Sequence, residues 1–207
     1  MPDSALESSL LARGCRTVAG VDEVGRGAWA GPVSVGVALV DLAGVEILPA
    51  GLDDSKALSP RAREALYPLL ARACRAFAVG HASPNECDAL GMTAAQELAA
   101  RRALAELGEV PDAVIVDGRV DFTGHPRAVL AVGADRTSLS VAAASVLAKV
   151  TRDRLLVAQA ERYPGYGLER HKGYPTLEHR RAVARLGLTA IHRRSWAFAR
   201  PIDPGGA

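Results

Sequence analysis

Four acidic residues stand at positions where the strands of an α/β protein would end. Asp22 and Glu23 close one apolar run, Asp117 closes another just before Gly118, and Asp135 lies three residues beyond a third. Because an open α/β sheet binds ligands at the carboxyl ends of its strands, we expect these side chains at one rim. Four carboxylates in a dry site stay ionised only with cations between them, and hard oxygen ligands select Mg²⁺ or Mn²⁺ over zinc. Their placement predicts a divalent-cation site, although each acid taken singly also suits a turn.

Asp22 and Glu23 pose a geometric problem, because neighbouring residues of a strand point to opposite faces of the sheet. The two carboxylates should share a site only where the pleat is interrupted. Gly25 and Gly27 follow directly, and glycine adopts backbone conformations that other residues avoid. We therefore expect the pleat to break near these glycines.

The elements that must position these acids follow an α/β pattern. Short runs rich in Val and Ala, bounded by Gly, Pro or Asp, predict five strands at residues 17–22, 33–41, 76–81, 113–117 and 128–132. A glycine-rich stretch long enough for a wide hairpin separates the first two, whereas the later runs alternate with helical patterns. This order predicts a mixed sheet with helices packed on it.

Several helix boundaries are marked in the sequence. Ser59-Pro60 and Ser83-Pro84 each place proline after an N-cap residue, and Pro68 should end or kink the first of these helices. Residues 93–96 (TAAQ) form a capping-box pattern that predicts the start of a helix ending at Gly108. A long helix is expected over 138–162 and a basic one over 176–185.

The composition fits one folded domain. The chain has 207 residues, of which 49% are hydrophobic and 23% charged. We expect a single domain over 1–207, with its core at about 17–198 and short flexible termini. No apolar run reaches the roughly 18 residues of a membrane helix, and the N-terminus does not resemble a signal peptide. The odd number of widely spaced cysteines, Cys15, Cys74 and Cys87, predicts free thiols in the cytoplasm.

The net charge of +2 conceals two halves of opposite sign. Residues 1–148 carry 13 basic against 18 acidic side chains, a net of −5, while residues 149–200 carry 12 against 4, a net of +8. Such a chain could hold cations at one place and phosphates at another. Taken alone, the charge favours a simpler interpretation, a solvated basic helix surface.

Longer stretches of the sequence resemble the bacterial ribonuclease HII family. The first is residues 18–27 (VAGVDEVGRG), followed by Ala30-Gly31-Pro32. In order and spacing the remaining stretches also agree, namely residues 54–56 (DSK) with 58–59 (LS), 115–118 (IVDG), 133–135 (GAD), 143–153 (AASVLAKVTRD), 166–167 (YG), 171–176 (HKGYPT) and 192–195 (HRRS). The resemblance covers roughly residues 17–198, so it concerns the whole expected core.

The resemblance implies a ribonuclease H-like fold and an endoribonuclease. Such an enzyme cuts the RNA strand of RNA/DNA hybrids and nicks duplex DNA 5′ of an embedded ribonucleotide, leaving 5′-phosphate and 3′-hydroxyl ends. It also implies two-metal hydrolysis with Mg²⁺ or Mn²⁺ held by Asp22, Glu23, Asp117 and Asp135.

Substrate-binding residues follow from the same resemblance. The Gly25-Arg26-Gly27 loop would contact the 2′-hydroxyl that distinguishes RNA from DNA, with a salt bridge as the alternative role for Arg26. Tyr174 would stack at the ribose of the RNA–DNA junction. The candidate phosphate-contacting residues are Ser55, Lys56, Lys149, Lys172, Arg193 and Arg194. We expect a monomer, and no motif indicates a protein partner or a membrane.

Two other classes remain open at this point. A non-catalytic module that binds hybrids would need the basic face but not the complete acid set. A small-molecule α/β enzyme should carry a GxGxxG loop after a strand, and Gly25-Arg26-Gly27 lacks the third glycine. His171, His179 and His192 suit phosphate contact or plain surface better than a general-base role.

Overall fold

The computed structural model describes residues 2–40, 49 and 51–199, and the five expected strands form one mixed sheet within them. The strands are β1 (Val18–Val24), β2 (Val33–Val40), β3 (Ala76–Ala82), β4 (Ala113–Asp117) and β5 (Ala128–Ala131), in the order β3-β2-β1-β4-β5. β1 pairs antiparallel with β2 and parallel with β4, so the central strand connects the two kinds of pairing. The end of the second strand was expected at residue 41, which lies outside the described residues.

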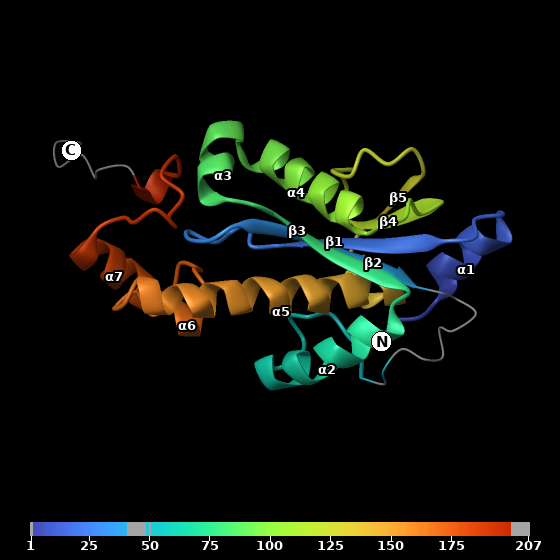
Figure 1. Cartoon of the computed structure of the whole chain (residues 1–207), viewed down its shortest axis with the longest axis horizontal. Helices are drawn as coiled ribbons and strands as arrows, with labels where there is room; N and C mark the ends of the chain where they lie inside the picture. The colour runs from blue at the N-terminus through green and yellow to red at the C-terminus, as the bar shows by residue number, and fades with distance from the viewer. Residues whose placement is uncertain (1, 41–48, 50, 200–207) are drawn as a thin grey trace.

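Helices cover both faces of this sheet (Figure 1). α4 (Met92–Glu106) lies on one face with α3 (Pro84–Leu90) beside it, and its alanines pack on valines of β1, β2 and β4. α5 (Leu139–Arg162) and α2 (Pro60–Ala73) lie on the other face. A side chain in place of Gly36 on β2 would put its Cβ 2.5 Å from the Ala144 carbonyl oxygen. The glycine therefore lets α5 lie directly against the sheet.

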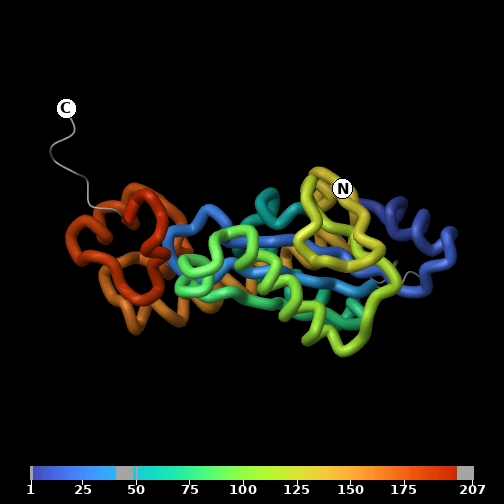
Figure 2. The backbone as a smooth tube through the Cα atoms, turned by 90° about the horizontal axis from the view of Figure 1, so that it is seen from above, coloured from blue at the N-terminus to red at the C-terminus, as the bar shows by residue number. Residues whose placement is uncertain are grey.

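The C-terminal elements gather at the opposite end of the molecule from the N-terminal helix (Figure 2). They are α6 (Leu168–His171), α7 (Leu177–Leu186) and the 3-10 turn η3 (Ala197–Ala199). The basic helix expected at 176–185 corresponds to α7, which begins after its N-cap Thr176. No helix of the described residues is long and apolar enough to cross a bilayer.

Two helix boundaries differ from the predictions. Pro68 lies inside α2, which continues to Ala73, because α2 is held against α5 by the buried Leu66 and Leu70. α4 begins at Met92 after Gly91, one residue before the expected cap, and its N-terminus has no side-chain cap.

The N-terminal segment, expected to be flexible, instead forms α1 (Ala5–Ala12). Glu7 is fully buried and accepts hydrogen bonds from the Ser138 hydroxyl (2.5 Å) and the Ser140 amide (2.9 Å) at the start of α5. α1 thus supports the N-terminus of the helix that begins just after Asp135.

Candidate active site

Asp22 and Glu23 line the same cavity although β1 is not broken. The ladder between β1 and β2 continues without a bulge to Val24, so the expected interruption of the pleat is absent between these strands. On the other side, the pairing of β1 with β4 ends at Val21 and Val116. Beyond Val21 the edge of β1 is therefore open, and side chains from both of its faces reach a cavity of about 210 Å³. The termination of β4, and not the glycines, brings the two carboxylates together.

The other two acids approach this open edge from β4 and from the turn before α5. Asp117 is the last residue of β4, and its carboxylate accepts a hydrogen bond from the Ala134 amide at 2.8 Å. Asp135 follows in the 3-10 turn η2 (Ala134–Arg136) and is 3% exposed. One hydrogen bond therefore ties the segments that carry Asp117 and Asp135.

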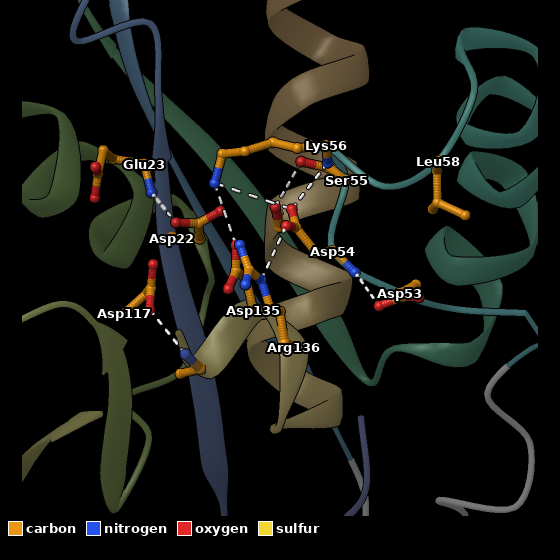
Figure 3. A network of polar contacts seen from close by, with 12 residues as sticks. Asp22, Glu23, Asp53, Asp54, Ser55, Lys56, Leu58, Asp117, Asp135 and Arg136 are labelled. Atoms are coloured by element: carbon orange, nitrogen blue, oxygen red, sulfur yellow. Dashed lines mark hydrogen bonds and ion pairs between the residues drawn. The ribbon is translucent and has the colours of Figure 1, made fainter. Parts of the chain in front are cut away.

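Lys56 places its ammonium group among the carboxylates (Figure 3). Its Nζ lies 3.2 Å from an Asp135 oxygen and 3.9 Å from an Asp54 oxygen, while 71% of its side chain remains exposed. The buried Asp54 also accepts the Lys56 amide at 2.8 Å. Arg63 fixes this segment from behind by donating to the carbonyls of Ser55 (2.5 Å) and Leu58 (2.6 Å).

The electrostatics of the cavity are those of crowded carboxylates. Burial raises the pKa of Asp22 to about 7, with Glu23 and Asp117 adding to the rise and Ser145 and Lys56 opposing it. Burial also raises the pKa of Glu23, although Arg26 opposes this shift. For Asp135, burial raises the pKa and Lys56 opposes the rise. The carboxylates therefore have less positive charge near them than full ionisation requires.

This donor set fits a hard divalent cation. Four carboxylates supply only oxygen ligands, and a cation of charge +2 would lower the pKa values that burial raises. As the side chains stand, no three Asp, Glu, His or Cys residues in the described ranges converge on a point that could hold a metal. The Lys56 ammonium lies among the carboxylates, so cation binding would require both Lys56 and the carboxylates to move.

The buried Arg193 holds the Gly25-Arg26-Gly27 loop. Gly25 has φ +90°, a conformation that favours glycine, and a Cβ there would overlap the Arg152 side chain. Arg193 donates to the carbonyls of Gly25 (2.7 Å) and Arg26 (2.8 Å) and is 0% exposed. The prediction that Arg193 contacts phosphate was therefore wrong, because its guanidinium is used inside the protein.

Arg26 itself is exposed and contacts Gln96, which the sequence indicated only as part of a helix cap. Its Nη1 donates to the side-chain oxygen of Gln96, and the Gln96 amide nitrogen lies 3.3 Å from a Glu23 carboxylate oxygen. Gln96 is 2% exposed on the sheet-facing side of α4. It therefore links the glycine loop to Glu23. The sequence marked Gln96 only as the last residue of a predicted capping box, which the structure does not form.

Tyr174 and Lys149 complete the wall of the cavity. The Lys149 ammonium lies 5.3 Å from the centre of the Tyr174 ring and also pairs with Asp153 at 2.7 Å. Arg152 lies 5.4 Å from the same ring. This arginine is fully buried and donates to the carbonyls of Ala30 and Lys172, both at 3.0 Å. It therefore connects the segment after the glycine loop to the one that carries Tyr174.

Two predicted phosphate contacts lie outside this cavity. Lys172 lines a separate cleft between α2 and α5, and its ammonium donates to the Glu169 carbonyl. Arg194 is exposed in the C-terminal segment, where its backbone amide donates to Asp88 at 2.7 Å. The structure therefore brings together Asp22, Glu23, Gly25, Arg26, Gly27, Ser55, Lys56, Asp117, Lys149 and Tyr174 around one cavity, with Asp135 reached through Lys56.

The three histidines of the basic half are buried, contrary to the expectation of a surface or phosphate role. His179 and His192 are 0% and 1% exposed, with their Nε2 atoms 3.2 Å apart, and the His171 ring stacks on His179. His179 also contacts the Tyr174 carbonyl at 3.0 Å through Nδ1. The cluster therefore supports the Tyr174 segment from inside the fold.

Comparison with known proteins agrees with this arrangement. The sequence pattern of the family "Ribonuclease HII" matches residues 19–199. A protein named ribonuclease HII from Ruegeria sp. (strain TM1040) is 48% identical over 197 residues, which cover 94% of this chain and 84% of the relative.

Solved structures show the same fold. The ribonuclease H2 of Pyrococcus horikoshii OT3 superposes with a TM-score of 0.74 at 33% identity, covering 89% of this chain and 95% of that one. The structure of Bst-RNase HIII in complex with Mn²⁺ gives a TM-score of 0.69 at 22% identity, covering 88% and 68%. These matches confirm the predicted ribonuclease H-like α/β fold with its five-stranded mixed sheet. The chain belongs to the ribonuclease HII family and is a metal-dependent endoribonuclease.

Proposed function

We propose that this enzyme cleaves the RNA strand of RNA/DNA hybrids and nicks duplex DNA on the 5′ side of an embedded ribonucleotide, leaving 5′-phosphate and 3′-hydroxyl ends. The observation that carries the proposal is the shared cavity. Three of the four acids line it together with the Gly25-Arg26-Gly27 loop and Tyr174. Groups suited to hydrolysing a phosphodiester and groups suited to reading a ribose therefore face the same space.

In this proposal Asp22, Glu23, Asp117 and Asp135 hold two divalent cations, Mg²⁺ or Mn²⁺. When bound, such cations activate water and stabilise the leaving oxygen of a phosphodiester. The contribution of the protein is to keep the carboxylates ionised and oriented. Arg26 opposes the rise in the pKa of Glu23, Gln96 orients the Glu23 carboxylate, and the Ala134 amide orients that of Asp117.

Recognition of the ribose follows from backbone and ring contacts. The 2′-hydroxyl both donates and accepts hydrogen bonds, so the exposed backbone of Gly27 suits it. Tyr174 offers a ring for stacking on the sugar at the junction, with Lys149 beside it. Ser55, Lys56 and Lys149 contact the nearest phosphates, and Lys172 and Arg194 contact phosphates farther along the duplex.

We infer that the enzyme acts as a monomer in the cytoplasm. Cys15, Cys74 and Cys87 are buried free thiols, which persist in a reducing compartment.

The test compares three duplexes of one sequence: an RNA/DNA hybrid, DNA with one embedded ribonucleotide, and DNA alone. The proposal expects Mg²⁺-dependent cleavage of the first two, with a 5′-phosphate at the ribonucleotide, and none of the third. Binding of the first two without cleavage in either Mg²⁺ or Mn²⁺ would instead support a non-catalytic hybrid-binding module.

A further inference from the structure

A second cavity of about 240 Å³ lies against the active-site cavity, towards α4. It shares Glu23, Arg26 and Asp117 with the first cavity. The rest of its lining comes from the first turns of α4 and from the segment after β4, namely Thr93, Gln96, Gly118, Arg119, Val120 and Phe122. Thr93 was expected only to cap a helix, and Arg119 belongs to none of the sequence motifs.

Two arginines give this second cavity its positive charge. Arg119 is exposed, and within residues 2–40, 49 and 51–199 its side chain has no hydrogen bond or ion pair. Arg26 is held in the shared wall by the buried amide of Gln96. One guanidinium is therefore fixed and the other is available to a ligand.

The carboxylates in the shared wall determine whether this positive charge is neutralised. Glu23 and Asp117 balance the two arginines while the acids carry no cation. With divalent cations on those acids, the arginines dominate the local potential. An anion would then bind in the second cavity beside the metal site.

The position of the cavity indicates which anion this would be. A nucleic acid strand that crosses the acids must continue on both sides of the cleaved bond. Tyr174 and Lys149 line the first cavity and are absent from the lining of the second. Arginine suits phosphate oxygens because its planar fork donates two parallel hydrogen bonds.

We propose that the second cavity is a subsite for one phosphodiester of the cleaved strand, held by Arg119 and Arg26 on the side of the scissile bond away from Tyr174. The inference rests on the proposed function, since it requires a nucleic acid strand at the four acids. It adds Arg119 as a substrate-binding residue.

The experiment replaces single phosphodiesters flanking one embedded ribonucleotide with neutral methylphosphonates. Each substrate is cleaved in Mg²⁺ by the wild-type enzyme, Arg119→Ala, Arg119→Lys, and the control Arg101→Ala, which removes an exposed arginine of α4 outside both cavities. Arg119→Ala should raise KM about tenfold with little change in kcat, because the charged contact aids binding more than chemistry. Arg119→Lys should recover part of the loss, and Arg101→Ala should match the wild type.

The methylphosphonate series locates the contact. At one position the substitution should weaken wild-type binding but add no further penalty to Arg119→Ala. Binding of the DNA-only duplex, which the enzyme should not cleave, is measured by anisotropy in Mg²⁺ and should also show a salt slope lower by about one in Arg119→Ala. The proposal is overturned if Arg119→Ala cleaves like the wild type, or if every position penalises both enzymes equally. Failure of the wild-type enzyme to cleave the unmodified duplex would instead reject the proposed function.

Discussion

Arg193 donates from Nη2 to the carbonyl oxygen of Gly25 at 2.7 Å, joining residues 168 positions apart in the sequence. The same guanidinium donates to the carbonyls of Arg26 and Gly31, so it satisfies three loop acceptors inside the protein. No carboxylate pairs with it among the described residues. The shape of the glycine loop therefore depends on a residue of the C-terminal segment.

Arg193→Met should destabilise the fold by about 3 kcal/mol, because it leaves these buried carbonyls without a donor. It should also raise KM for a ribonucleotide-containing duplex more than it lowers kcat. Urea unfolding and steady-state kinetics measure the two effects. Arg101→Met, at an exposed arginine of α4 outside both cavities, is the matched control, and equal effects of the two substitutions would contradict the role of Arg193.

Asp22→Asn should stabilise the metal-free protein at high pH while abolishing most cleavage. Because burial raises the pKa of Asp22 from 3.8 to about 7, the folded chain retains a proton that the unfolded chain loses in this range. Stability from this group is therefore lost as pH rises from about 4 to 7, and Asn removes that loss. At pH 8 in EDTA the gain should be about 3 kcal/mol or less, shrinking towards pH 4.

Urea unfolding of the wild type, Asp22→Asn and the α4 charge-loss control Glu97→Gln, across this pH range, provides the measurement. If the wild type is more stable to urea than Asp22→Asn at pH 8 without metal, the result would contradict a pKa of Asp22 raised by burial.

Acid should weaken the fold through the histidine cluster. Burial and the neighbouring His179 lower the pKa of His192 from 6.5 to about 4. The unfolded chain therefore binds a proton that the folded chain resists, and stability falls as pH drops from about 6.5 to 4. His192→Gln should flatten this part of the stability profile, although it lowers stability at pH 7. An unchanged slope in the variant would show that other groups cause the acid sensitivity.

Tyr174→Ala should weaken cleavage at a single embedded ribonucleotide by about ten- to a hundredfold, as expected for the loss of a stacking contact of roughly 1–3 kcal/mol. Long RNA/DNA hybrids should lose less, because their repeated 2′-hydroxyls give the Gly25-Arg26-Gly27 loop many registers. Tyr174→Phe retains the ring and should behave like the wild type. An equal loss on both substrates, or a shifted Mg²⁺ optimum, would show that Tyr174 is not a selective reader of the junction.

Local signals predicted most of the sheet. Runs of Val and Ala identified all five strands, and the N-cap residues Ser59 and Ser83 marked helix starts correctly. These features depend on neighbours in the sequence, so a sequence pattern can report them. Pro68 was misjudged because packing of α2 on α5 overrides the local cost of a proline in a helix.

The acids of the site were predictable, whereas the residues that hold its loops were not. Asp117 ends β4, and Asp22 follows the last β1 residue that pairs with β4, so type and position together suggest a function. In the sequence an arginine that binds phosphate cannot be told from one that binds carbonyls inside the protein. Only the burial of Arg193 against distant carbonyls shows its role. Gln96 and Arg152 act in the same way through tertiary contacts, which no spacing in the sequence encodes.

The central claim, that the four acids form one cation site used for cleavage, is tested most directly by titrating the protein with Mn²⁺. Electron paramagnetic resonance of the free ion reports binding, and the same samples are assayed on the duplex with one ribonucleotide. The wild type should bind two ions and cleave, whereas Asp117→Asn should bind fewer and lose at least about a hundredfold in rate, because a neutral amide is a weaker ligand. Wild-type ion binding and near-normal cleavage by Asp117→Asn would contradict the account.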